Sequence, residues 1–381
     1  MICEKIVRIA HVVSVETSNY FLNNLFDFSD HRKVQYFIIT LGKEGAFTQE
    51  MRERGVEVIQ IPAGNVKEKI RAVWKIKQVI HAKEIDLVHT HLFIPSLIGV
   101  RAAVMAGVKA LTTRHHSDAL YQIGSRVKRF IWLRLESYVN RKVNHLIAPS
   151  QMVYDILVKK EKVPATKVSL IPYGQTTARF DAITSERVAA SRKEHLMEGK
   201  LSMVFVARLF SRKGHTYLFR ALTRLQNDFP DLMLYLVGTG PQQQELEEMA
   251  VKEGVDHRVR FLGWRNDALC IMAAADMIVH PSLEDALSSA VIEAVMLQKP
   301  VVASDISGVR DTLGNGQYGI IVPPADDEAL EKGIRQLIAN MVMAKRNAAD
   351  GKRYLLEYMG AKRVADSYTE LYIKLLTQSY A

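Results

Sequence analysis

Two acidic residues stand eight positions apart in the stretch HPSLEDALSSAVIEAV, residues 280–295. The run DMIVHPS before them is typical of a short buried strand, and SSAVIEAVMLQ after them is typical of a helix with Ser288 or Ser289 as its N-cap. Asp285 is therefore expected in the loop, and Glu293 about one turn inside the helix. Ionised carboxylates accept hydrogen bonds from hydroxyl groups, whereas the N–H groups at a helix N-terminus suit phosphate. Hydroxyls beside phosphate indicate a nucleotide sugar as the ligand.

Two basic residues occupy a second strand-to-helix turn, in the stretch FVARLFSRKGHTYLFRAL. Arg208 ends the strand, and Lys213 comes just before Gly214 and the helix. Two cations at such a turn can neutralise the charge that develops on a diphosphate leaving group. The alternative is a cationic surface loop that binds no ligand. For such a loop considered by itself, this is the more common situation.

Two further strand ends offer backbone that could meet a ligand. VGTGP places Gly238 directly after a strand, where a glycine lets the backbone approach a ligand closely. No third glycine follows at the spacing of a dinucleotide fingerprint, so a tight turn alone also explains this stretch. FLGW ends another strand around Leu262, and its Trp264 either flanks a base or belongs to the core or its rim.

Histidines follow two of the apolar runs in the first half. His115 and His116 in TTRHHSDA stand at a strand end, and because adjacent strand residues point to opposite sides, one of them is expected to face a cleft. His89 and His91 in HTH have strand alternation and could form one edge of a metal site. No carboxylate or cysteine stands at matching spacing, so we expect no metal.

Length and composition indicate two domains without a membrane span. The chain has 381 residues, 48% of them hydrophobic, which is enough for two ordinary cores. No run approaches the roughly 18 apolar residues that cross a bilayer, and MICEKIVRIAHVV is typical of a first strand, so we expect a cytosolic protein. Cys3 and Cys270 have neither the number nor the spacing of a disulfide framework, which predicts two free thiols.

Short apolar runs alternate with helical patterns along the chain, which is typical of parallel α/β architecture. The rhythm pauses after IPYGQTTARF, in a charged helical segment, and restarts with LSMVFVARL. We therefore predict two α/β domains, residues 1–180 and 181–361, with ligands beyond the carboxyl ends of the strands in the cleft between them. The tail, about residues 362–381, is predicted to be an amphipathic helix that breaks from the preceding one near Gly360 and packs back on the first domain.

The net charge of +10 is unevenly distributed. Residues 1–180 hold 27 Lys and Arg against 15 Asp and Glu, whereas residues 181–381 hold 24 against 26. The first half therefore either meets an anionic partner or carries a solubilising surface.

One segment of that half, residues 123–145, interleaves basic and aromatic residues around a single acid, Glu136. Such a helix can lie on an anionic leaflet, and VKEKIRAVWKIKQVIHAKE adds a second basic helix with a tryptophan. The alternative is that its apolar stripe belongs to the core, because these residues also fit helical spacing: Val127, Phe130, Ile131, Arg134, Leu135, Tyr138 and Val139.

Taken together, these motifs resemble the retaining glycosyltransferases of family 4. The strongest match is HPSLEDALSSAVIEAVMLQKPVVASDISGVRD, and ARLFSRKG, VGTGP, FLGW, DLVHTH and IAPS…IPYG also match in order and spacing. The resemblance covers nearly the whole chain and implies the GT-B fold, α/β with two Rossmann-like domains whose parallel sheets face a central cleft. The first domain would bind the acceptor and the second the nucleotide-sugar donor.

The resemblance also implies a role for individual residues. Arg208 and Lys213 would hold the diphosphate, Glu293 would bind the ribose diol, and Asp285 and His115 would lie beside the donor sugar. The other donor-binding positions that it implies are Gly238, Leu262, Ser288, Ser289, Ala290 and Val291.

The chain departs from the family pattern in three places. The family usually has glutamate at the position of Asp285, so a shorter arm changes the sugar contact or lets Glu284 compete for it. Two positions that are glycine in the family signature are Ala286 and Ser288 in this chain, and their side chains narrow the space near the sugar. The loop SVETSNYF lacks the paired glycines common near phosphate and acceptor.

The implied activity is transfer of a sugar from a nucleoside diphosphate sugar to an acceptor hydroxyl, with retention, by front-face departure of the diphosphate and without metal or other cofactor. We expect a glycan or lipid-linked acceptor in cell-surface polysaccharide or glycolipid synthesis, on the cytoplasmic face of a membrane that residues 123–145 contact, and no nucleic acid. One alternative is a sugar-nucleotide epimerase, for which only Glu16 and Asp118 offer acids in the first domain. A second is a non-enzymatic anion-binding protein, although no nucleic-acid-reading module is recognisable.

Overall fold

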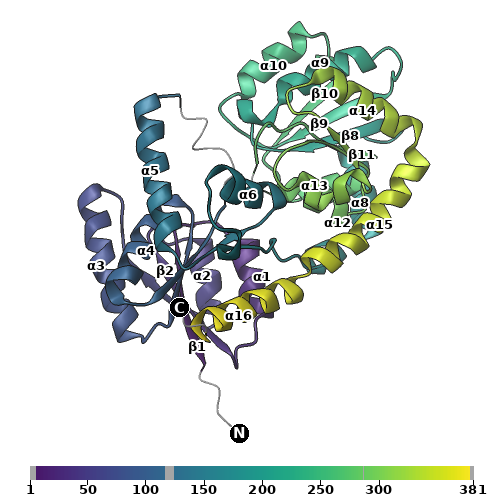
Figure 1. Ribbon diagram of the computed structural model, residues 1–381. Helices are drawn as coiled ribbons and strands as arrows, with labels where there is room; N and C mark the ends of the chain where they lie inside the picture. The colour runs from purple at the N-terminus through teal and green to yellow at the C-terminus, as the bar shows by residue number, and fades with distance from the viewer. Residues whose placement is uncertain (1–5, 116–123, 286, 378–381) are drawn as a thin grey trace. The chain divides into compact units, whose positions relative to one another are not determined.

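The computed structural model describes residues 6–115, 124–285 and 287–377 (Figure 1). The predictions for Cys3, His116, Asp118 and Ala286 lie outside these described residues. Cys270 is a buried free thiol, as predicted.

The chain divides into two compact units, each with its own sheet. The first unit consists of Met1–Gln175 together with Met359–Ala381, and the second consists of Thr176–Tyr358. The predicted boundaries were residues 180 and 361. Both sheets are parallel throughout, so the predicted class of two Rossmann-like α/β domains is confirmed.

The first unit contains a seven-stranded sheet in the order β3-β2-β1-β4-β5-β6-β7. Parallel strands covered by helices need apolar residues at consecutive positions, and β1 and β4 are buried along almost their whole length. The strands are β1 (Val7–Val13), β2 (Val34–Thr40), β3 (Glu57–Gln60), β4 (Leu87–His91), β5 (Lys109–Thr113), β6 (His145–Ala148) and β7 (Val168–Leu170). The helices are α1 (Tyr20–Phe28), α2 (Ala46–Glu53), α3 (Val66–Ala82), α4 (Phe93–Ala106), α5 (Arg126–Lys142), α6 (Gln151–Asp155) and α16 (Ala361–Thr377).

The second unit contains a six-stranded sheet in the order β10-β9-β8-β11-β12-β13. Its strands are β8 (Leu201–Val206), β9 (Leu232–Val237), β10 (Val259–Gly263), β11 (Met277–His280), β12 (Val301–Ser304) and β13 (Ile320–Val322). Its helices are α7 (Ala178–Asp181), α8 (Ser185–Glu194), α9 (His215–Leu225), α10 (Gln243–Lys252), α11 (Ala268–Ala274), α12 (Ser289–Met296), α13 (Val309–Thr312), α14 (Asp327–Ala339) and α15 (Met341–Met359).

Each sheet reverses its strand order at one place, between β1 and β4 in the first unit and between β8 and β11 in the second. Loops that leave adjacent strands at such a point run to opposite faces of the sheet, which opens a crevice at the carboxyl ends. The fold thus provides one natural binding position in each unit.

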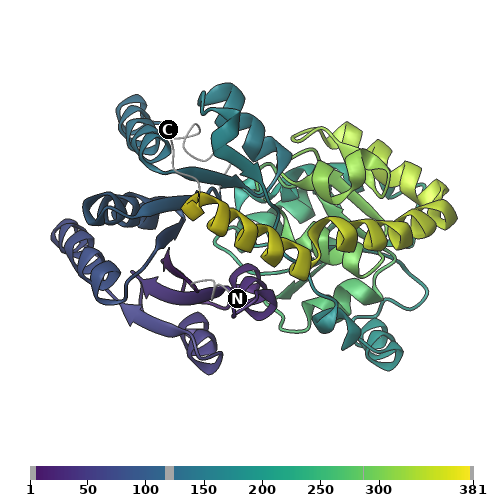
Figure 2. The ribbon, with the colours of Figure 1, turned by 60° about the horizontal axis from the view of Figure 1, so that its bottom comes forward.

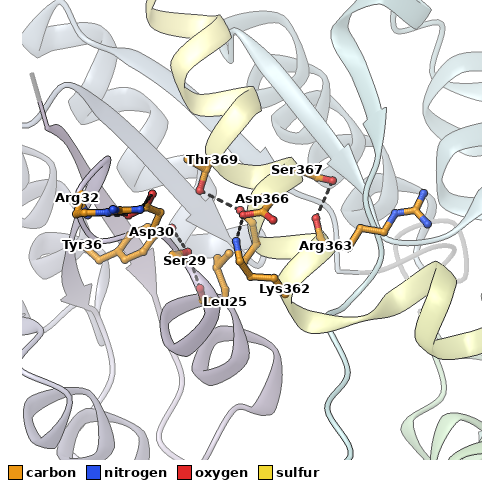
Figure 3. A network of polar contacts seen from close by, with 11 residues as sticks. Leu25, Ser29, Asp30, Arg32, Tyr36, Lys362, Arg363, Asp366, Ser367 and Thr369 are labelled. Atoms are coloured by element: carbon orange, nitrogen blue, oxygen red, sulfur yellow. Dashed lines mark hydrogen bonds and ion pairs between the residues drawn. The ribbon is translucent and has the colours of Figure 1, made fainter. Parts of the chain in front are cut away.

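The C-terminal segment completes the first unit. α15 ends at Met359 and α16 begins at Ala361, so the break predicted near Gly360 is confirmed. Gln175 accepts a hydrogen bond from the Ala361 amide at 2.8 Å, and Tyr368 and Tyr372 are fully buried in the core of the unit. Figure 3 shows α16 next to the Ser29 and Tyr36 side chains, which are hydrogen-bonded to each other at 2.7 Å.

The core beneath α1 and α16 contains histidines as well as apolar residues. His11 on β1 pairs in register with His89 on β4, and His91 follows two residues later on the same face. All three are buried, with at most 2% of the surface exposed. Because burial disfavours the charged form, the pKa of His11 falls to about 3, and those of His89 and His91 fall well below the usual value.

We expect the free energy of unfolding to decrease as the pH falls below about 6.5. An unfolded histidine takes up a proton near pH 6.5, whereas folded His11 does so only near pH 3, so protons favour the unfolded chain between these values. Each buried imidazole contributes up to about 1.4 kcal/mol per pH unit in this window, and the contribution is fully present above it. Thermal unfolding at pH 7, 6 and 5 measures the slope. A midpoint that stays constant from pH 7 to pH 5 would contradict the neutral buried cluster.

Candidate functional site

A cavity of about 720 Å³ lies at the carboxyl end of the second unit's sheet. The ends of β8, β9 and β11 contribute to it, which places it at the reversal of strand order. Most of the sequence-predicted donor-binding residues line this one space: Arg208, Lys213, Gly238, Asp285, Ser288, Ser289, Ala290 and Glu293.

Three predicted residues lie elsewhere. Leu262 does not line the cavity, and the exposed Trp264 beyond the end of its strand does. Val291 is also outside the lining, since it is fully buried, and its amide donates to the Ser288 hydroxyl, 3.5 Å away. His115 belongs to the first unit and lines a different cavity.

The loop between β8 and α9 is held against the end of β11 by a close backbone contact. Gly214 has a φ of +73°, and a Cβ at this position would lie 2.0 Å from the carbonyl oxygen of Pro281. Both the positive φ and the close approach of the Pro281 carbonyl exclude any residue other than glycine at this position. The contact brings Lys213 to Asp285, and their Nζ and Oδ2 atoms are 2.8 Å apart.

Arg208 is an exposed cation of the same loop. Its guanidinium lies 4.7 Å from the ring centre of Phe210, and it forms no ion pair with any residue that the structure describes. Arg212, which was not predicted, is also exposed, lies near the same ring and lines the same cavity. The cavity therefore presents two cations that an anionic ligand can pair with.

Gly238 serves the packing of the loop after β9. Its φ is +141°, and a Cβ would lie 2.0 Å from the carbonyl oxygen of Ala207. The glycine therefore permits the approach of two backbone segments, which agrees with the tight-turn alternative, and it also faces the cavity.

Asp285 is held between two partners. His280 Nε2 lies 3.6 Å from Asp285 Oδ2 and forms its hydrogen bond with Ser288 Oγ at 2.9 Å. Burial acts to raise the pKa of Asp285, but the neighbouring His280 and Lys213 outweigh it, and the net pKa is below the ordinary value. Asp285 is therefore ionised at neutral pH and can accept hydrogen bonds from hydroxyls.

Glu293 has a partner that sequence reasoning missed. Arg179 Nη1 on α7 donates to Glu293 Oε1 at 2.9 Å, and both side chains are mostly buried, with 23% and 16% of their surface exposed. The net pKa of Glu293 is above the ordinary value, because burial raises it by more than the charge and the hydrogen bond of Arg179 lower it. Arg179 therefore acts to keep the carboxylate ionised. The two residues are 114 positions apart in the sequence, so no local sequence pattern could have predicted this ion pair.

The N-terminus of α12 faces the same cavity. Ser288 is its N-cap, as predicted, and its side chain accepts from the amide of Val291. Ser289 and Ala290, the first two helical residues, line the cavity and have amides without an intrahelical acceptor. Together with the helix dipole they favour a negative charge at this end of the cavity.

In the first unit, a cavity of about 230 Å³ lies at the carboxyl ends of β1, β4 and β5. His115 lines it and is hydrogen-bonded through both ring nitrogens, to His91 at 3.0 Å and to the Tyr173 hydroxyl at 2.6 Å. Glu16, one of the two acids that an epimerase would need there, is exposed and does not line the cavity.

His89 and His91 have a third histidine beside them that the sequence pattern did not connect. Candidate ligand atoms of His11, His89 and His91 lie within 4.8 Å of one another. Both nitrogens of His89 are occupied, by the hydroxyls of Tyr372 and Thr113, each at 2.8 Å. His91 likewise uses both nitrogens, so the cluster is built as a hydrogen-bond network.

Comparison with protein families gives two matches that together span most of the chain. Residues 187–353 match the model described as Glycosyl transferases group 1. Residues 21–179 match the model described as Glycosyltransferase Family 4.

Similar proteins agree with these matches. The chain is 26% identical over 304 residues to a putative glycosyltransferase, EpsD, of Bacillus subtilis, covering 77% of this chain and 79% of that protein. It is 23% identical over 310 residues to the UDP-Gal:alpha-D-GlcNAc-diphosphoundecaprenol alpha-1,3-galactosyltransferase of Escherichia coli, with 81% and 80% covered. Among solved structures, Anabaena Alr3699/HepE in complex with UDP has a TM-score of 0.83 at 19% identity, with 97% of this chain and 100% of that chain covered.

We expect Arg179→Ala to raise the pKa of Glu293 further, because burial remains while the guanidinium is lost. It should also destabilise the second unit, on the order of 1–3 kcal/mol, since a mostly buried carboxylate loses its partner. A carboxyl-carbon NMR titration of glutamate-labelled protein measures the pKa, and Glu293→Gln identifies the resonance. Arg187→Ala, an exposed arginine on α8, is the matched control. An unchanged Glu293 titration in Arg179→Ala would show that the ion pair does not control this carboxylate.

Proposed function

Because the chain belongs to the group 1 glycosyltransferases, we propose that it transfers a sugar from a nucleoside diphosphate sugar to an acceptor hydroxyl with retention of configuration. One observation carries this proposal: a single cavity presents cations and a helix N-terminus for phosphate beside two ionisable carboxylates for hydroxyls. This combination matches the two chemical parts of a nucleotide sugar.

We propose the following residue roles. Arg208, Lys213 and the amides of Ser289 and Ala290 would face the diphosphate. Glu293, held by Arg179, would accept from the ribose diol, and Asp285 would accept from the donor sugar. Lys213 is shared, because it pairs with Asp285 and also borders the phosphate position.

In the proposed step, the bond from the anomeric carbon to the diphosphate oxygen breaks, and its electron pair stays on that oxygen. The acceptor oxygen forms its bond to the anomeric carbon from the same face, and its proton passes to the departing diphosphate. Positive groups placed where this charge develops lower the barrier, which is the role of Arg208, Lys213 and the N-terminus of α12. Since they neutralise the leaving group, the proposed reaction uses no metal ion or other cofactor.

The similar proteins support a cell-surface glycan or glycolipid as the product. The relative from Escherichia coli is named for UDP-galactose as donor and a diphosphoundecaprenol-linked sugar as acceptor. The Anabaena structure contains UDP. By analogy, we propose a uridine nucleotide as the donor and a glycan or lipid-linked glycan as the acceptor of this chain.

A nucleotide screen tests the donor assignment. We expect UDP to raise the melting temperature more than GDP or ADP, since a ligand that binds only the folded state stabilises it. Arg208→Ala and Lys213→Ala should each reduce sugar transfer by about 10²-fold or more, the effect of removing one such contact in the transition state. Lys252→Ala, at an exposed position, is the control. Near-normal transfer by both loop variants would rule out this site.

We further propose that the first unit binds an anionic membrane through α3 and α5. α4 packs against both helices, and Figure 2 shows the three side by side. The core alternative is wrong for four residues of the α5 stripe, because they are exposed: Val127, Phe130, Ile131 and Leu135.

Helix α3 has the same character as α5. Val66, Ile70 and Trp74 recur every fourth residue and have 71%, 60% and 56% of their surface exposed. Basic residues flank both stripes: Lys67, Lys69, Arg71, Lys75, Arg126, Lys128, Arg129 and Arg134. Exposed apolar residues bordered by cations fit the headgroup region of an anionic leaflet. None of the described helices is long and apolar enough to cross a membrane. On the ground of the exposed stripes and their flanking cations, we propose peripheral binding, on the cytoplasmic face.

Liposome sedimentation tests the membrane proposal. Binding should require anionic lipid and weaken with salt, because each cation near the surface contributes about 1 kcal/mol. Replacing Arg126, Lys128 and Arg129 by Glu should abolish it. The matched control replaces Lys252, Lys345 and Arg346, exposed residues of the second unit, by Glu and should retain binding. Equal loss in both triple variants would show that only net charge matters, and failure of the wild type to bind any vesicle would indicate a non-membrane acceptor.

A further inference from the structure

Two carboxylates and a histidine of the second unit lie together where helices α8 and α11 pack against each other. Glu194 is the last residue of α8, His195 follows it as the C-cap, and Asp267 directly precedes α11. Candidate ligand atoms of the three side chains lie within 4.8 Å of one another. None of these three residues lines the cavity of the second unit, so the cluster is a separate feature.

The imidazole of His195 is the unusual member of this cluster. Only 7% of its side chain is exposed, and Nε2 has no hydrogen-bond partner among the residues that the structure describes. Nε2 lies 3.8 Å from Glu194 Oε1, which is beyond hydrogen-bond distance. A buried polar atom without a partner costs free energy and calls for a specific explanation, such as a bound water or ion.

Neither protonation state of this nitrogen is satisfied by the described part of the chain. An N–H at Nε2 would lack an acceptor. A bare lone pair would lie close to the negatively charged carboxylate of Glu194, and the two would repel each other. A cation between the imidazole and the carboxylates removes this conflict, because it binds the lone pairs of both.

A side-chain cation already pairs with the two carboxylates. Arg265 Nη2 lies 2.9 Å from Glu194 Oε1 and 2.8 Å from Asp267 Oδ2, so it bridges them, and Nε lies 2.8 Å from Asp267 Oδ1. The hydrogen bond from Arg265 is the main reason why the pKa of Asp267 is below its ordinary value. No hydrogen bond from this guanidinium reaches Nε2 of His195. Arg265 therefore satisfies the carboxylates and leaves the imidazole unpaired.

We propose that Glu194, His195 and Asp267 form a binding site for a divalent transition-metal ion of the zinc class, which takes the place of the Arg265 guanidinium. The site goes beyond the proposed sugar transfer, and no step of that reaction passes through the ion.

The donor set favours this class of ion. One imidazole and two carboxylates are ligands that zinc-class ions accept, whereas Mg²⁺ and Ca²⁺ are bound through oxygen. Three protein ligands leave the fourth position of a tetrahedral ion for water. The two carboxylates balance the charge of a divalent ion, whereas a single guanidinium balances only one of them.

The surrounding structure holds the histidine in place and leaves one ligand adjustable. Arg192 donates to the carbonyl oxygens of Met197 at 3.2 Å and Ala274 at 2.5 Å, which ties the turn after His195 to the end of α11. Ligand atoms bound at about 2.0–2.1 Å to a tetrahedral ion lie roughly 3.4 Å apart. This is closer than the 3.8 Å between Nε2 and Glu194 Oε1. Glu194 can make the adjustment, because 55% of its side chain is exposed.

Titration of the metal-free full chain with Co²⁺ provides the test, because the visible spectrum of Co²⁺ reports its coordination. The wild type should bind one Co²⁺ with nitrogen and oxygen ligands, release it to Zn²⁺, and give no comparable binding of Mg²⁺. Glu194→Gln and His195→Gln should each lose this binding. The matched control is His257→Gln, which removes an exposed histidine 4.0 Å from the Asp256 carboxylate in the same unit and should retain it.

Arg265→Ala tests the competition between the guanidinium and the ion. It should strengthen Co²⁺ binding by about threefold to tenfold, since two ion pairs no longer have to be broken first. Unchanged or weaker binding in Arg265→Ala, wild-type binding in Glu194→Gln, or equally strong binding of Mg²⁺ would overturn the proposal. So would a wild type that binds neither Co²⁺ nor Zn²⁺, which would assign a water molecule to Nε2. Because Glu194 is exposed, its variant keeps the test valid even if His195→Gln does not fold.

Discussion

The approach of Gly214 to the Pro281 carbonyl is the contact on which the second unit's site depends. It joins the loop after β8 to the end of β11, and these two strands are neighbours at the reversal of strand order. Because no side chain separates the two backbones, Lys213 reaches Asp285 across 72 residues of sequence. The same approach places Arg208 and the N-terminus of α12 around one cavity. A backbone contact that only glycine permits thus determines which charged residues line the cavity together.

Charge balance within that cavity follows from these contacts. Each carboxylate has a cation beside it, Lys213 for Asp285 and Arg179 for Glu293. A half-buried carboxylate without such a partner would take up a proton more readily and lose part of its capacity to accept hydrogen bonds. Arg208 and Arg212 add positive charge that no described carboxylate pairs with. The cavity therefore favours a ligand that brings its own negative charge, together with hydroxyls for the two carboxylates.

The sequence predicted the parts of the fold and site that depend on local pattern. Strand and helix periodicity indicated the two α/β units, and the serines before an apolar run indicated an N-cap at Ser288 or Ser289, which the structure has at Ser288. The residues it did not reveal are those placed by tertiary contact. Arg179 meets Glu293 from 114 positions away, and His11 joins His91 only because β1 and β4 are adjacent in the sheet. Val291 was assigned to phosphate although the Ser288 side chain already uses its amide, a competition that spacing alone does not disclose.

The exposure of the apolar stripe on α5 likewise could not be predicted from the sequence and is seen only in the structure. Helical spacing is the same whether an apolar face meets a core or a lipid, and only the exposed fractions of Val127 and Phe130, 70% and 64%, separate the two. On α3 the buried face is formed by Ala72, Ile76 and Ile80, so the stripe with Trp74 is an additional apolar face. An apolar helix face that stays exposed does not contribute to the stability of its own unit. The exposed face of α3 therefore supports an external partner for that surface.

The two cavities complement each other in chemistry. The cavity of the second unit combines cations, carboxylates and helix amides, which suits a charged donor. Among the described residues that line it, the cavity of the first unit has only uncharged side chains, because burial keeps the imidazole of His115 neutral at pH 7. Burial of the histidines therefore does more than fill the core, because it places hydrogen-bonding groups at a mostly apolar cavity without adding a charge.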